Sequence, residues 1–130
     1  MTEDYVEAWR GLLARHATTA CALDRELGER HGLGMSGFEV LERLVEALAA
    51  DDKDSCRLHD LASSVHLSQS ALSRLIARLE KDGLVERSMC EADRRGIMVC
   101  LTEAGRTRYQ EARSTHRAVL AQTLGTRTPG

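Results

Sequence analysis

Apolar residues and one histidine recur at steps of three and four through the first part of the chain, which is the spacing of one face of an α-helix. The members of this stripe are Val6, Trp9, Leu13, His16, Ala20, Leu23 and Leu27. The pattern predicts one long helix that ends in the glycine-rich stretch 28–34. Two interpretations stay open, because such a stripe suits either a core alone or a core together with a seam against a second chain.

A second helix is expected from about Gly37 to Ala50. Ser36 and Glu39 have the spacing of a capping box, in which each side chain satisfies a free backbone N–H at the start of a helix. The expected inward positions are Phe38, Leu41, Leu44, Val45 and Leu48. The polar run 51–55 that follows is expected to be a loop.

Residues 58–79 carry the most specific pattern in the chain, two short helices joined by a tight turn. The inward apolar positions are Leu61, Ala62, Val65, Leu72, Leu75, Ile76 and Leu79. Leu67 would close the turn, and Ser68 would cap the second helix. Because a small residue such as Ala62 suits the close crossing of two helices, the segment is predicted to be a helix-turn-helix.

The outward face of the second helix is polar and contains no carboxylate before Glu80. Its members are Gln69, Ser70, Ser73, Arg74 and Arg78. Glutamine and arginine make paired hydrogen bonds to base edges in the major groove of DNA, and serine reaches bases or phosphates. The simpler alternative is an ordinary solvated helix face, but the preceding short helix and the lack of acids favour DNA.

Two short runs with strand propensity follow, 84–88 and 97–101, after a stop signal at Gly83. They predict a β-hairpin, a wing, whose charged tip carries Arg94 and Arg95. A guanidinium there would enter a minor groove and use its negative potential. Thr102 would cap a last helix, with Tyr109, Ala112, His116, Val119 and Leu120 along one side.

Composition agrees with a mainly helical chain, since 42% of residues are hydrophobic and only 3% are aromatic. No apolar run is long enough to cross a membrane, and the N-terminus lacks the features of a signal peptide, so a cytoplasmic location is expected. The net charge of −2 is unevenly distributed. Residues 1–54 contain six basic and twelve acidic residues, whereas residues 55–130 contain twelve and eight, so the basic charge accompanies the predicted helix-turn-helix.

The cysteines and histidines suggest little chemistry. Cys90 is the candidate for redox sensing because it lies in the predicted wing near several arginines, with an ordinary exposed thiol as the alternative. Cys21 and Cys100 are expected to be small buried residues. The histidines form no His-x-x-x-His pair, so no metal site and no cofactor are expected. No nucleophile motif, phosphate loop or pair of carboxylates supports an enzyme.

The order of these elements resembles the MarR family of winged helix-turn-helix regulators. The resemblance is dense over residues 58–105 and includes Gly83-Leu84-Val85, Asp93-Arg94-Arg95-Gly96 and Leu101-Thr-Glu-Ala-Gly105. It implies a mainly α fold with a small β-hairpin: a DNA-binding lobe at 37–101 with its wing at 84–101, and dimerisation helices at 1–34 and 102–130.

The resemblance also implies roles for individual residues. Asp93 would orient the wing and Arg95 would enter the minor groove. The residues that would face the major groove are Ser68, Gln69, Ser70, Ser73 and Arg74, with Arg78 on the same helix face. The first and last helices would interleave with those of a second subunit to give a homodimer.

Some relatives sense small aromatic or phenolic molecules in a crevice between the dimer helices and the DNA-binding lobe. Here Trp9, His16, Met35 and Phe38 are the candidate lining, and core positions are the alternative. We therefore expect a regulator that binds a pseudo-palindromic duplex operator, a repressor responsive to a small molecule or an oxidant. The alternative is a winged-helix module that binds protein and reads no bases.

Overall fold

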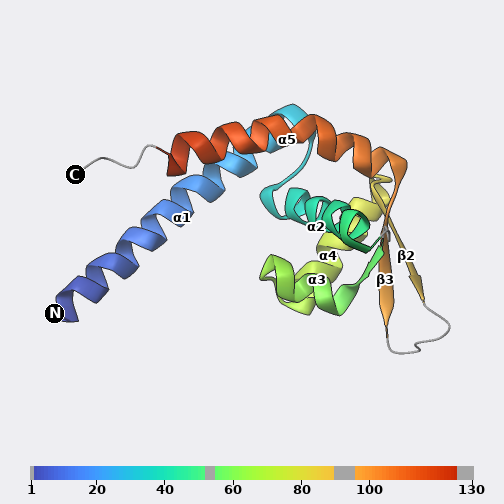
Figure 1. Cartoon of the computed structure of the whole chain (residues 1–130), viewed down its shortest axis with the longest axis horizontal. Coiled ribbons are helices and arrows are strands. Elements are labelled where there is room, and N and C mark those ends of the chain that lie inside the picture. Colours follow the sequence, from blue (N-terminus) through green and yellow to red (C-terminus); the bar gives the residue numbers. More distant parts are fainter. Residues whose placement is uncertain (1, 52–54, 90–95, 126–130) are drawn as a thin grey trace. The chain divides into compact units, whose positions relative to one another are not determined.

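A computed structural model describes residues 2–51, 55–89 and 96–125 of the chain (Figure 1). The elements in chain order are α1 (Thr2–His31), α2 (Met35–Asp51), β1 (Ser55–Arg57), α3 (Leu58–Val65), α4 (Gln69–Lys81), β2 (Val85–Met89), β3 (Ile97–Leu101) and α5 (Glu103–Leu124). This order confirms the predicted fold class, which is mainly helical with a small antiparallel sheet.

The chain divides into two compact units. One unit combines the part before Ser36 with the part after Glu111, and the other is Ser36–Glu111. The first turns of α5 thus belong to the unit that also contains the helix-turn-helix.

The first unit is built from α1 and the later turns of α5, which run antiparallel. His31 near the end of α1 shares a hydrogen bond of 2.9 Å with Thr115. Leu12 in the first half of α1 borders the same hollow as Leu124 at the end of α5. The buried apolar side chains of this unit are Leu23, Leu27, Leu33, Ala112 and Val119.

The predicted apolar stripe of α1 is divided between core and surface. Leu23 and Leu27 are buried, but every residue from Asp4 to Thr18 is exposed. Trp9 is 59% exposed and Leu12 is 62% exposed. The first half of α1 therefore presents an apolar face that the described part of the chain leaves exposed.

The start of α2 differs from the predicted capping box. The helix begins at Met35, so Ser36 lies inside it and does not precede it. The carboxylate of Asp24 accepts a hydrogen bond of 2.8 Å from the Met35 backbone N–H. The free backbone N–H at the start of α2 is thus satisfied by Asp24, eleven residues earlier in the sequence, and not by the side chains of the predicted capping box.

Helix α2 supplies the core of the second unit. Phe38, Leu41 and Leu44 are fully buried as predicted, and Val40 joins them. The ring of Phe38 packs against that of Tyr109 in α5, with centroids 5.2 Å apart. The phenolic O–H of Tyr109 donates to Glu42 at 2.8 Å, which gives the buried carboxylate a partner that the sequence did not predict.

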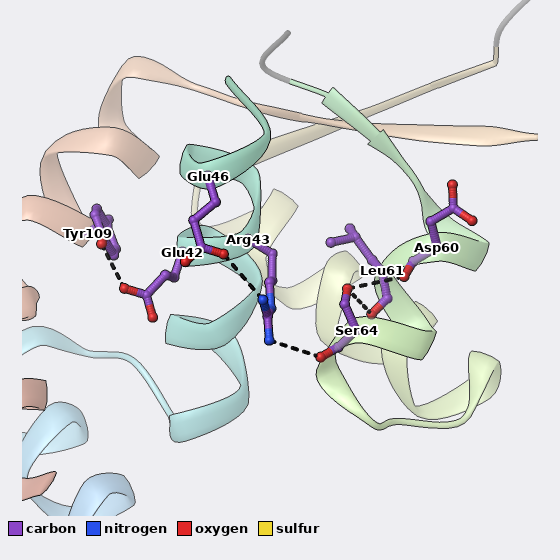
Figure 2. Close-up of polar contacts among 7 residues, drawn as sticks. All are labelled: Glu42, Arg43, Glu46, Asp60, Leu61, Ser64 and Tyr109. Carbon is purple, nitrogen blue, oxygen red and sulfur yellow. Dashed lines mark hydrogen bonds and ion pairs between the residues drawn. The ribbon is translucent and has the colours of Figure 1, made fainter. Parts of the chain in front are cut away.

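Neighbouring residues of α2 reach in different directions (Figure 2). Glu42 points to Tyr109, while Arg43 points to α3. The Arg43 guanidinium donates to the Ser64 carbonyl at 3.4 Å and pairs with Glu46 at 3.3 Å. A cation near the last turn of α3 interacts favourably with the free carbonyls there, so Arg43 ties α2 to the helix-turn-helix.

The sheet has the strand order β1-β3-β2 with antiparallel pairing throughout. The predicted hairpin is present, with Val85 opposite Leu101 and Met89 opposite Ile97. Strand β1 was missed, because the expected polar loop over 51–55 left no strand before α3. Its three residues pair with Met98 to Cys100 of β3 and lead directly into α3.

The junction after α4 explains the motif Leu101-Thr-x-x-Gly105. Gly83 adopts a left-handed conformation with φ +78°, and the next N–H, of Leu84, bonds the Leu79 carbonyl at 2.9 Å to close the helix. The Thr102 hydroxyl donates to the Gly83 carbonyl at 2.7 Å and accepts from the Gly105 N–H at 3.0 Å. A Cβ at Gly105 would overlap the Leu84 carbonyl oxygen, so only glycine fits there.

Candidate nucleic-acid interface

The turn between α3 and α4 forms without glycine. His66 ends α3 in the left-handed conformation, with φ 61° and ψ 42°. Such a conformation costs a residue with a Cβ on the order of 1 kcal/mol. The Leu67 N–H bonds the Ala62 carbonyl at 3.1 Å, which closes the turn as the sequence predicted.

Ser68 begins α4 as predicted. Its backbone is extended, and its hydroxyl accepts a hydrogen bond of 3.1 Å from the Ala71 N–H. Leu72, Ile76 and Leu79 are buried against the rest of the unit. The cap and the apolar face together determine which side chains of α4 point outward.

The outward face of α4 carries polar and basic groups. Ser68, Gln69, Ser70, Arg74 and Arg78 are exposed, and Ser73 is half-buried. No residue from Ser68 to Leu79 is acidic. Neither Arg74 nor Arg78 makes a side-chain ion pair with any residue that the structure describes. Both guanidinium groups are therefore available to an external anion.

The first carboxylate of α4, Glu80, is held in an ion pair. Glu80 accepts from the Nε of Arg87 at 3.0 Å and from the backbone N–H of Arg87 at 3.3 Å. Arg87 belongs to β2, so this contact also joins the end of α4 to the sheet. The pair offsets the negative charge of the first carboxylate in α4.

A hollow of about 690 Å³ lies beside the start of α4. It is lined by Arg57, Leu58, His59, Asp60, Gln69, Gly96 and Ile97. Within it, Gln69 Nε2 and His59 Nδ1 form a hydrogen bond of 2.9 Å. No sequence pattern predicted this contact, because the two residues are ten positions apart on different helices and neither belongs to an apolar stripe.

The predicted wing residues lie outside the described part of the chain. These are Asp93, Arg94 and Arg95, and the redox candidate Cys90. The strands that carry them are described, and β3 is held between β1 and β2.

The four candidate residues of the effector crevice differ in their surroundings. Trp9 and His16 are exposed, and His16 borders a hollow of about 260 Å³ in the first unit. Met35 is half-buried. Phe38 belongs to the other unit and is fully buried against Tyr109, so its ring is part of the core.

Cys21 corrects one sequence-based expectation, because its thiol is exposed and not buried. Cys21 is two positions away from each of the buried residues Thr19 and Leu23, and a helix turns by about 200° over two positions. Cys21 therefore lies on the opposite side of α1. Cys100 is half-buried in β3.

Within the described ranges, no three His, Cys, Asp or Glu side chains come together in a way that could hold a metal ion. Among the same residues, no helix combines the length and the apolar character that crossing a membrane requires.

Comparisons with known proteins point to one family. The sequence profile of the MarR family matches residues 49–97. The Homoprotocatechuate degradative operon repressor of Escherichia coli is 30% identical over 103 residues, which cover 79% of this chain and 64% of that protein. The chain thus spans less than two thirds of the length of this curated relative.

Solved structures extend the similarity over almost the whole chain. AbsC, a MarR family transcriptional regulator from Streptomyces coelicolor, is 33% identical with a TM-score of 0.81, covering 95% of this chain and 80% of AbsC. Sco3205 from the same organism, a MarR family regulator solved in complex with DNA, is 27% identical with a TM-score of 0.85, covering 99% of this chain and 78% of Sco3205.

Proposed function

Because the chain belongs to the MarR family of transcriptional regulators, we propose that it is a homodimeric repressor that binds a pseudo-palindromic operator in duplex DNA. The family consists of regulators and not of enzymes. As a regulator of this kind, the protein would act in the cytoplasm beside the chromosome.

The observation that carries the proposal is the outward face of α4. It is exposed, free of carboxylates from Ser68 to Leu79, and supplied with two guanidinium groups at Arg74 and Arg78. Gln69 and Arg74 have the donors and acceptors that distinguish base pairs in a major groove. The wing, with Asp93 orienting Arg94 and Arg95, would enter the adjacent minor groove.

The exposed first half of α1 supports a homodimer. Its large apolar side chains are Tyr5, Val6, Trp9, Leu12 and Leu13, and Leu124 of α5 adds to them. Apolar faces of this extent usually mark an interface. Two copies would hold two α4 helices at a spacing of one helical turn of DNA.

Repression and its relief are the finer parts of the proposal. The name of the Escherichia coli relative supports a repressor. A small aromatic effector would bind beside Trp9, His16 and Met35, and the full burial of Phe38 assigns that ring to the supporting core. The rival signal is oxidation of Cys90 in the wing. Titration of an operator complex with peroxide, for the wild type and Cys90→Ser, separates the two, because only the thiol route disappears in the variant.

Selection of bound sites from random duplexes tests the central proposal. We expect an enriched sequence with two related half-sites, and an affinity that falls steeply with salt because bound arginines release counterions from phosphates. Failure to enrich any sequence at low salt, by a protein shown to be folded, would contradict base-specific DNA binding. Enrichment of a single half-site by a monomer would contradict the dimer.

A further inference from the structure

We propose that His59 is a positioning residue for base recognition: it holds the carboxamide of Gln69 in the orientation that reads an adenine. This inference rests on the proposed DNA-binding function and assigns a specificity role that the helix face of α4 alone does not supply. Its basis is the 2.9 Å hydrogen bond between Gln69 Nε2 and His59 Nδ1.

The chemistry of the two groups determines the direction of this bond. The Nε2 of glutamine carries two hydrogens and can only donate. His59 Nδ1 must therefore accept, which requires a neutral imidazole whose single proton is on Nε2. The bond uses one of the two N–H groups of Gln69.

The remaining edge of the Gln69 amide has the pattern for adenine. When the N–H that points away from the carbonyl oxygen donates to His59, the other N–H and the oxygen are left side by side. This donor and acceptor pair matches N7 and the N6 amino group of adenine in the major groove. A glutamine without such a contact rotates freely about its last side-chain bond. The contact with His59 therefore lowers the conformational entropy that Gln69 would lose on binding DNA.

The position of the pair suits this role. Both side chains are exposed, and both line the hollow between the starts of α3, α4 and β3. His59 comes from the first helix of the helix-turn-helix and Gln69 from the first turn of the second. First-turn residues of the second helix are those that contact base edges in this motif.

The experiment compares duplex selections for the wild type and a matched set of variants. Gln69→Ala first locates the base pair whose preference depends on Gln69. His59→Leu removes the acceptor and is expected to lower the adenine preference at that base pair about tenfold, which lies within the discrimination of one paired contact. His59→Asn keeps an oxygen acceptor near the place of Nδ1, so it should preserve the preference.

A further readout separates positioning from a structural role. In the Gln69→Ala background, His59→Leu should have no additional effect on base preference. Melting temperatures of all variants are measured in parallel, and His59→Ala, which also removes the acceptor, replaces the Leu variant if that variant is unfolded.

The outcomes distinguish this inference from the function on which it rests. If the wild type selects no sequence, the proposed function fails. If the wild type selects an operator but His59→Leu leaves the adenine preference unchanged, or weakens binding equally at every base pair, His59 does not position Gln69 and the inference is overturned.

Discussion

The first half of α1 and the helix α4 are both amphipathic, but the apolar side is buried in α4 and exposed in α1. The apolar side of α4 is buried through Leu72, Ile76 and Leu79, and its polar side faces solvent. In α1, Asp4 to Thr18 are exposed all around the helix, including Trp9. The apolar side of α4 is covered within its own unit and the helix offers a charged surface, whereas the first half of α1 leaves an apolar surface exposed. The proposed function accounts for the difference, because it would place DNA against α4 and a second copy against α1.

The strongest test of this comparison is a charge on the apolar face of α1. Leu12→Glu should weaken dimer formation by about 4 kcal/mol, on the order of a thousandfold, because the dimer would bury an unpaired carboxylate. Light scattering over a range of protein concentrations measures the effect. Ala14→Glu is the control, since residue 14 lies on roughly the opposite side of the helix and should leave assembly unchanged. Equal behaviour of the two variants would contradict the assignment.

The same substitution of glycine by alanine should have opposite signs in the two regions. Gly105→Ala should lower the free energy of unfolding by about 3 kcal/mol, because the added methyl group meets the Leu84 carbonyl and the Leu101 side chain. Gly11→Ala in α1 has open space and should raise it by roughly 0.5–1 kcal/mol through helix propensity. Urea denaturation measures both, and a loss of stability in Gly11→Ala would show that this side of α1 is also covered.

Removal of one guanidinium group from α4 and, separately, one from α1 tests which helix contributes basic charge to DNA binding. Arg74→Ala should weaken operator binding by about 2 kcal/mol, roughly thirtyfold, since a groove contact is lost. Arg10→Ala in α1 should leave binding within error. Fluorescence anisotropy at several salt concentrations is the measurement. A change limited to the salt slope would assign Arg74 to a phosphate and not to a base.

The smallest expected effect concerns the turn that presents α4. His66→Gly should raise the free energy of unfolding by about 1 kcal/mol, because glycine adopts the left-handed conformation without the penalty of a Cβ. His66→Ala should give no such gain. Thermal unfolding monitored by circular dichroism decides between them, and equal stability of the two variants would exclude backbone strain at His66.

The sequence predicted the elements whose signals are local. The ends of α4 follow from Ser68 and Gly83, and the start of α5 follows from Thr102, because each cap acts within a few residues. The core of α2 follows from helical periodicity through Phe38 and Leu41. The resemblance to the MarR family, which depended on these elements, is confirmed by the comparisons.

The features that the sequence missed depend on contacts between distant residues. Strand β1 exists because it pairs with β3, more than forty residues later in the chain. Asp24 contacts the start of α2 only because the chain turns back after α1. The buried carboxylate of Glu42 has a hydrogen-bond donor only because α5 places Tyr109 beside it. His59 and Gln69 meet because two helices cross at a turn. None of these partners can be chosen from spacing alone, since each depends on how separate elements pack.

The arrangement of the sheet also affects solubility. A β-hairpin with two open sides can recruit strands from neighbouring molecules and begin to aggregate. Here β1 shields one side of β3 and then runs immediately into a helix, while β2 on the other side displays the charged side chains of Glu86 and Arg87. Both flanks are poor templates for further strands, so crowded copies of this protein should associate through helices and not through a growing sheet.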